Sequence, residues 1–177
     1  MSLSLDGSTG IITGLDVTTS QLPGGSILQV VQSSTSTQVA VTNTTYTDTG
    51  LSASITPASS SNKILAIINQ GYRMGRSDPA EGFGIKIFRD STEIYTPISD
   101  STGPFMVYRT IAGSTSNVEY GYISMQILDA PNSTSSLTYK VQGRPYTDLN
   151  SGLVRFQQNA STGNHQISYI TLMEVAA

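Results

Sequence analysis

The chain has 177 residues, of which 37% are hydrophobic and only 12% charged, with a net charge of −3, one histidine and no cysteine. The length suits one domain with a sizeable core and leaves no room for a second domain of similar size. The missing cysteines exclude disulfides, a cysteine nucleophile and a thiolate metal site. The acidic balance, without a basic stripe, argues against binding to nucleic acid.

Residues 1–25 differ from the rest of the chain. They are rich in glycine, serine and threonine, their apolar residues apart from Ile11-Ile12 occur singly, and no period of 2 or 3.6 runs through them. The segment ends in the turn-forming cluster Pro23-Gly24-Gly25. We therefore expect an extended N-terminal arm that becomes ordered against a partner, and no signal peptide. The candidate anchoring residues of this arm are Leu5, Ile11, Ile12, Leu15 and Val17.

From Ser26 onward, short runs rich in β-branched and aromatic residues alternate with clusters of turn-forming residues. The 26 serines and 22 threonines fit this pattern, since threonine favours strands and serine favours turns. The first runs predict strands over Ser26–Ser33, Val39–Thr47 and Leu51–Ile55, with a turn at Asp48–Gly50.

Two longer runs, Lys63–Arg73 and Asn117–Leu128, are apolar on both faces. An antiparallel strand usually shows apolar residues on the core face only, so these two strands are expected to be central or to contact another subunit. The longest apolar stretch within them, Ile64–Ile68, is too short to cross a bilayer, and no membrane insertion is expected. The candidate subunit-interface residues are Ile64, Ile68, Tyr72, Tyr120 and Tyr122.

The remaining strands complete an all-β chain of about nine or ten strands without a helical period. This spacing predicts an antiparallel β-sandwich over residues 26–177, and a jelly roll of roughly eight strands in two sheets is the preferred topology. The remaining expected strands are Gly82–Arg89, Glu93–Thr96, Met106–Ile111, Leu137–Val141, Leu153–Gln158 and Gln166–Val175.

No catalytic, cofactor-binding or metal-binding residue is predicted. His165, the one histidine, lies in a turn before the last strand, and no Gly-x-Ser-x-Gly motif accompanies it. One histidine without cysteines disfavours zinc. The nearest oxygen pairs for calcium, Asp129 with Asn132 and Asp148 with Asn150, are more simply turn-capping residues, and a calcium-binding loop is left open.

A mixed stretch of charge around residues 73–100 has two interpretations. Its acids, Asp78, Glu81, Asp90, Glu93 and Asp100, are mixed with Arg73, Arg76 and Arg89, which favours exposed, charge-balanced loops. The alternative is a shallow polar surface that contacts a sugar or another subunit, since tyrosine and arginine pairs in loops suit such contacts.

Several segments resemble small structural proteins of tailed bacteriophages, especially phages of aquatic bacteria and cyanobacteria. They are Leu5–Ile11, Gly25–Gln32, Tyr46–Pro57, Ser61–Leu65 and Ile167–Ala177. The resemblance covers most of the chain. It implies a virion protein made in the host bacterial cytoplasm, with no catalytic residues and no cofactor. Such proteins are often trimers, so it also implies a homotrimer.

Two virion roles are open. In the first, the arm lies across the major capsid protein and the trimer decorates and cements the capsid, as a cement protein or short head fibre. In the second, the domain is the knob of a tail fibre and recognises a host surface glycan or protein. The chain has no coiled-coil or shaft repeat, and its arm reaches at most roughly 80 Å when extended, which favours decoration. An enzyme acting on surface polysaccharide is the least favoured class.

Overall fold

The structure is a computed structural model, in which every regular element of the described residues is a β-strand. Two short strand pairs, β1 (Ser4–Leu5) with β2 (Ile12–Thr13) and β9 (Ser99–Asp100) with β10 (Gly103–Pro104), belong to neither large sheet. The described residues are 4–5, 12–13, 22–76, 80–97, 99–100, 103–104, 106–110, 117–146, 153–158 and 166–177.

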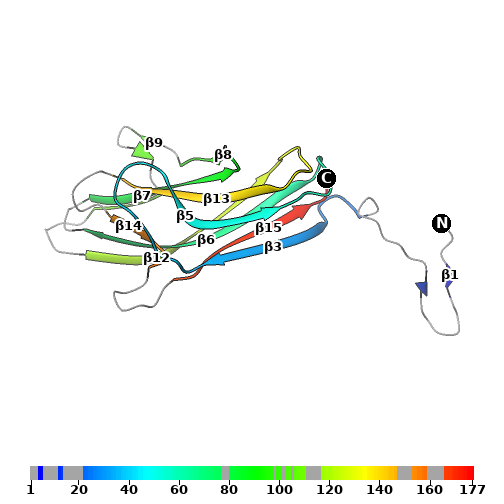
Figure 1. The fold of residues 1–177 in the computed structure, drawn as a ribbon, viewed down its shortest axis with the longest axis horizontal. Coiled ribbons are helices and arrows are strands. Elements are labelled where there is room, and N and C mark those ends of the chain that lie inside the picture. The colour runs from blue at the N-terminus through cyan, green and yellow to red at the C-terminus, as the bar shows by residue number, and fades with distance from the viewer. Residues whose placement is uncertain are drawn as a thin grey trace.

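The other strands form two antiparallel sheets, which lie face to face in Figure 1. In the first, the β6 sheet, the long central strand β6 pairs along one edge with β12 and along the other with β15 and β14, which pair in turn with β3 and β4. In the second, the β7 sheet, the order is β5, β13, β7, and then β11 and β8 share the far edge of β7. The strands of the two sheets are β3 (Ile27–Thr35), β4 (Val39–Val41), β5 (Thr47–Ile55), β6 (Lys63–Arg76), β7 (Ala80–Arg89), β8 (Thr92–Tyr95), β11 (Val107–Thr110), β12 (Asn117–Asp129), β13 (Leu137–Pro145), β14 (Leu153–Phe156) and β15 (Ser168–Val175).

The strand order of the described residues is that of a jelly roll. We count β3 with β4 as the first strand position, β8 with β11 as the fifth and β14 with β15 as the last. The first position then pairs with the eighth, the second with the seventh, the third with the sixth and the fourth with the fifth. One sheet holds positions 1-8-3-6 and the other 2-7-4-5, which is the double Greek key of a two-sheet jelly roll. The predicted fold class is confirmed.

The core lies between the two sheets and is built from alternate residues of each strand. Along β13, every second residue from Leu137 to Pro145 is buried. The largest contacts across the core are aromatic: Tyr72 and Phe156 of the β6 sheet flank Phe83 of the β7 sheet, with ring centroids 4.8 and 6.0 Å apart. The period of 2 thus gives each sheet one buried face.

Two neighbouring predicted segments differ from the structure. The strand expected over Val39–Thr47 ends at Val41, because Asn43 accepts a hydrogen bond from Thr45 N (3.0 Å) and forms a local turn. The turn expected at Asp48–Gly50 lies instead inside β5, where Thr49 is fully buried. Gly50 has φ of 82°, which suits the bulge at which β5 shifts its register against β13.

A buried polar cluster lies where the last strand position is broken between β14 and β15. Ser168 Oγ accepts hydrogen bonds from Gly71 N (2.9 Å) and Gln70 Nε2 (3.0 Å). The side-chain oxygen Oε1 of Gln70 accepts one from Thr49 Oγ1 (3.0 Å). The Gln157 amide lies 3.1 Å from Ser168 Oγ. The cluster replaces ladder hydrogen bonds that the break removes, so these buried groups keep their partners.

A second buried polar group, Glu174 of β15, is 1% exposed and fixes the end of the chain. Its carboxylate accepts hydrogen bonds from Gln29 Nε2 (2.6 Å), Asn62 Nδ2 (2.6 Å) and Ala58 N (2.7 Å). Burial acts to raise the pKa of Glu174, but the hydrogen bonds from Asn62, Gln29 and the backbone outweigh it and lower the pKa. The charged form is therefore the one that stabilises the fold.

We expect Ser168→Ala to lower the free energy of unfolding by about 1–3 kcal/mol, because Gly71 N–H and the Gln70 amide lose their acceptor inside the protein. The matched control is Ser54→Ala, which removes an exposed hydroxyl bonded to Thr138 and is expected to change stability by less than about 0.5 kcal/mol. Urea unfolding measures both. An equal decrease in the free energy of unfolding in the two variants would contradict the stabilising role of the buried cluster.

Glu174→Gln is expected to lower the free energy of unfolding at pH 7 by about 1–3 kcal/mol, since an amide cannot accept from all of these donors. Because the folded-state pKa of Glu174 lies below the unfolded value of about 4.3, its contribution is complete above that value and is lost as the pH falls through the folded-state pKa. The difference in the free energy of unfolding between wild type and variant should therefore become smaller below about pH 4. A gap that is constant from pH 7 to pH 3 would contradict this role.

Candidate functional site

The two outer faces of the sandwich differ in character. Among the described residues, every large hydrophobic side chain that is more than about a third exposed, apart from Leu22, belongs to a strand of the β6 sheet or directly precedes one. None lies on a strand of the β7 sheet. These side chains are Leu22, Ile27, Val30, Ile67, Val118, Tyr120, Tyr122, Leu128, Ile167 and Tyr169.

Strand register joins part of this surface into one row. Val30 lies opposite Met173, Met173 opposite Leu65, and Leu65 opposite Leu128. The row thus crosses β3, β15, β6 and β12 with four apolar side chains, and its ends are 57% exposed at Val30 and 55% at Leu128. We call this set the apolar row. Contiguous exposed apolar surface of this kind marks interaction sites in soluble proteins.

The far end of the same face carries two arginines and a tyrosine. Arg73 of β6 lies directly opposite both Arg155 of β14 and Tyr120 of β12. The Arg73 guanidinium lies 6.0 Å from the centroid of the Tyr120 ring. Burial and the neighbouring Arg73 lower the pKa of Arg155, and Arg155 Nε is buried without a hydrogen-bond partner among the described residues. We call Arg73 and Arg155 the arginine pair.

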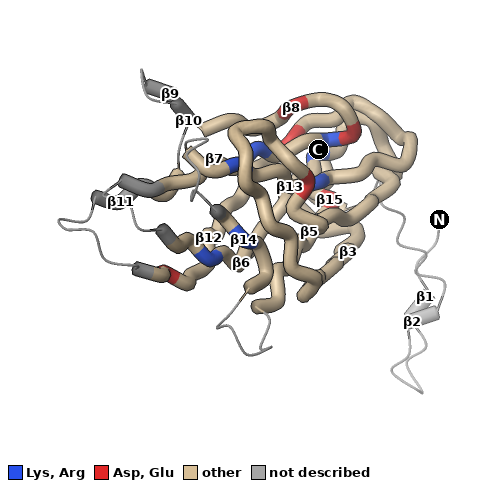
Figure 2. Tube along the Cα trace, turned by 60° about the vertical axis from the view of Figure 1, so that its left-hand side comes forward, with Lys and Arg blue, Asp and Glu red and all other residues tan. Residues whose placement is uncertain are grey.

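The outer face of the β7 sheet is charged instead. Lys86 pairs with Glu93, and Lys140 pairs with Asp48 at 3.1 Å. The Tyr46 ring lies between two cations, with Lys86 Nζ at 4.9 Å and the Arg144 guanidinium carbon at 5.3 Å from its centroid. Figure 2 shows charged residues along β7, β8 and β13, whereas β3 of the other sheet is tan throughout.

Three of the five candidate interface residues need correction. Ile64 and Ile68 are 0% exposed and Tyr72 is 7% exposed, because the even-numbered residues of β6 turn inward and pack in the core. The outward apolar residues of this strand are Leu65 and Ile67, as the alternation allowed, but sequence alone did not decide which face was inside. Tyr120 and Tyr122 of β12 point outward and remain candidates.

The candidate arm residues fall at the margin of the described chain. Leu5 and Ile12 are cross-strand partners in the β1–β2 pair. Ile11, Leu15 and Val17 lie outside the described residues, as does His165.

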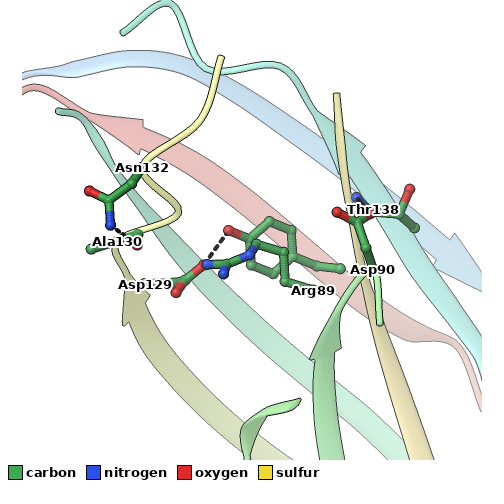
Figure 3. Close-up of polar contacts among 7 residues, drawn as sticks. Arg89, Asp90, Asp129, Ala130, Asn132 and Thr138 are labelled. Atoms are coloured by element: carbon green, nitrogen blue, oxygen red, sulfur yellow. Dashed lines mark hydrogen bonds and ion pairs between the residues drawn. The ribbon is translucent and has the colours of Figure 1, made fainter. Parts of the chain in front are cut away.

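The candidate calcium pair is occupied by structural contacts, as Figure 3 shows. Asp129 Oδ2 accepts hydrogen bonds from Arg89 Nη1 and Tyr139 Oη, each at 2.6 Å, which joins the end of β12 to the β7 sheet. Asn132 donates to Ala130 O of its own loop. Burial and the Asp129 carboxylate raise the pKa of Tyr139, so its hydroxyl stays protonated and donates. Asp148 and Asn150 lie outside the described residues.

Within the part of the chain that the structure describes, no group of three histidine, cysteine, aspartate or glutamate side chains is placed to hold a metal ion. No helix in that part is long and apolar enough to cross a membrane.

Comparison with known proteins yields only distant likenesses. No family model matches the chain. No curated protein matches it significantly. Among solved structures, the infectious bursal disease virus VP2 subviral particle aligns over 83% of this chain and 39% of its own, with 11% identity and a TM-score of 0.36. The infectious bursal disease virus Gx strain structure aligns over 100% and 42%, with 12% identity and a TM-score of 0.35. The chain thus spans less than half the length of these proteins, and at such TM-scores the likeness assigns no function.

Proposed function

We propose that the chain is a structural protein of a bacteriophage virion surface that assembles into homotrimers through the outer face of the β6 sheet. The observation that carries the proposal is the contrast between the two outer faces. One is charged and internally paired, and the other presents the apolar row with Tyr120 and Tyr122 beside it. The resemblance to phage structural proteins supplies the virion setting.

The composition of this face supports burial against protein. Protein interfaces are depleted of charge at their centre and enriched in tyrosine, methionine and arginine. Met173 belongs to the apolar row. Tyr120 and Tyr122 lie on β12, the strand that also carries Leu128, and the arginine pair lies at the far end of the face. A homotrimer is a closed ring, which buries such a face on every copy.

The N-terminal arm, residues 1–25, is proposed as a separate contact element from the sandwich domain, residues 26–177. Its apolar residues Leu5, Ile11, Ile12, Leu15 and Val17 would anchor the protein to another virion component, of which the major capsid protein is the first choice. This arrangement describes a capsid decoration, or cement, protein or a short head fibre.

A tail-fibre knob is the second candidate, and one observation favours it. Tyr46 lies between Lys86 and Arg144 on the outer face of the β7 sheet, which assembly through the other sheet leaves accessible. An aromatic ring with flanking cations suits an acidic host glycan.

Self-association is tested by placing a charge at each end of the apolar row. The double variant Val30→Lys with Leu128→Lys should be monomeric in sedimentation velocity at concentrations where the wild type is trimeric, because the lysines must be desolvated on assembly. The matched control, Ser52→Lys with Ser54→Lys, places the same charges on exposed positions of β5 and should leave the trimer intact. A trimer that survives Val30→Lys with Leu128→Lys would contradict the proposed interface.

The virion role is tested by copy number in purified particles. A decoration protein should be present in hundreds of copies per particle on a stained gel, whereas a fibre protein is present in a few dozen or fewer. Deleting residues 1–21 should abolish attachment while the domain stays folded. Truncated protein that still binds particles would contradict the role of the arm as an anchor.

A further inference from the structure

We propose that the surface covering the outer face of the β6 sheet is the N-terminal arm of a neighbouring copy, with aspartates of that arm meeting the arginine pair. This inference rests on the proposed self-association and deepens it by naming what lies on the face. The virion component that first receives the arm is then a second copy of this chain.

No described residue supplies a counter-ion to the arginine pair. Arg73 and Arg155 stand directly opposite each other on adjacent strands, an arrangement in which like charges destabilise a sheet. Neither has an ion-pair partner among the described residues, and Arg155 Nε is buried without an acceptor. The other carboxylates whose side chains the structure describes already have a partner. Asp48 pairs with Lys140, Glu93 with Lys86, Asp90 with Thr138 N, Glu119 with Tyr72, Asp129 with Arg89, and Glu174 with Asn62.

The face also cannot supply this counter-ion to a second copy of itself. The outward residues of β3, β6, β12, β14 and β15 that the structure describes include Lys63, Arg73 and Arg155 but no aspartate or glutamate. A two-fold dimer in which this face meets the same face would bring cations toward cations at close range. The partner surface must therefore be a different part of the chain, and a heterologous contact of that kind closes rings such as trimers.

The arm has the complementary chemistry. Its only charged side chains are Asp6 and Asp16, because the first lysine or arginine of the whole sequence is Lys63. Apart from the adjacent Ile11 and Ile12, its apolar residues are spaced singly between polar ones or glycines, a pattern that suits an apolar surface better than a core of its own. The arm is therefore acidic and partly apolar, whereas the outer face of the β6 sheet is cationic and partly apolar, so the two surfaces are complementary.

The described part of the arm needs a surface to pack on. β1 and β2 form a two-stranded ribbon in which Leu5 lies opposite Ile12, and an isolated two-stranded ribbon is marginally stable in water. Within the described residues these two strands pair only with each other and join neither large sheet. Among the described residues, no strand pairs with the ribbon and no element covers the outer face of the β6 sheet. We therefore assign the arm to the neighbouring copy.

The dimensions allow the contact. The 14 residues of β6 span about 46 Å at roughly 3.3 Å per residue. The 21 residues before Leu22 reach about 70 Å when fully extended, and less where β1 and β2 pair. The arm can therefore run along the face of a neighbour from the apolar row to the arginine pair.

A charge-swap experiment on the full chain tests the pairing. Arg73→Glu with Arg155→Glu, and separately Asp6→Lys with Asp16→Lys, should each raise the concentration at the midpoint of assembly at least about tenfold. All four changes together should bring that midpoint back to within about threefold of wild type. The matched control combines Asp6→Lys and Asp16→Lys with Lys86→Glu and Lys140→Glu on the other sheet, and should show no recovery. Thermal melts check that each variant folds.

The cysteine-free sequence permits a second, direct test. Asp16→Cys with Arg155→Cys, oxidised during assembly, should give covalent dimers and trimers on a non-reducing gel, whereas Asp16→Cys with Lys140→Cys should not. Failure of the swap to restore assembly, or disulfides confined within single chains, would overturn the arm assignment. A wild type that is oligomeric in those same experiments would still uphold the proposed self-association, and a wild type that is monomeric throughout would refute it.

Discussion

Every strand of a sandwich turns half of its side chains away from the core. In the β6 sheet, the outward side chains include large apolar ones that are exposed to solvent in a single copy. Leu65, Met173, Val30 and Leu128 line up across four strands because antiparallel register places them opposite one another. In the β7 sheet the same constraint places Lys86 and Lys140 outward, each with a carboxylate partner. This asymmetry is the physical basis for placing the function of the protein on a surface.

The jelly-roll core keeps the strands of this surface in register, although the last strand position of the jelly roll is broken. The break between β14 and β15 is closed by buried side-chain hydrogen bonds around Ser168 and Gln70. At the other end of β15, the Glu174 carboxylate ties β3 and the loop before β6 to the last strand. Both groups of hydrogen bonds act on the strand that carries Met173. The position of the apolar row therefore depends on polar groups buried directly behind it.

Sequence periodicity predicted much of this architecture. The alternation in Lys63–Arg73 separated Leu65 and Ile67 from Ile64 and Ile68 correctly, but a period of 2 does not say which set faces the core. That choice depends on the partner sheet, so two buried isoleucines were expected at an interface. Asp48–Gly50 was misassigned for a related reason: residues typical of turns occur inside β5, because Thr49 finds buried partners and Gly50 accommodates a bulge. The arginine pair was not foreseen, since Arg73 and Arg155 lie far apart in sequence and only strand pairing brings them together.

We propose that assembly buries the outer face of the β6 sheet and leaves that of the β7 sheet in solvent. Hydroxyl-radical footprinting of the full chain, compared at concentrations below and above assembly, measures this side chain by side chain. Val30, Tyr122, Leu128 and Met173 should become protected on assembly, while Phe88 and Tyr95 of the β7 sheet should react equally in both states. Protection confined to the β7 sheet, or no change at the apolar row, would contradict the account.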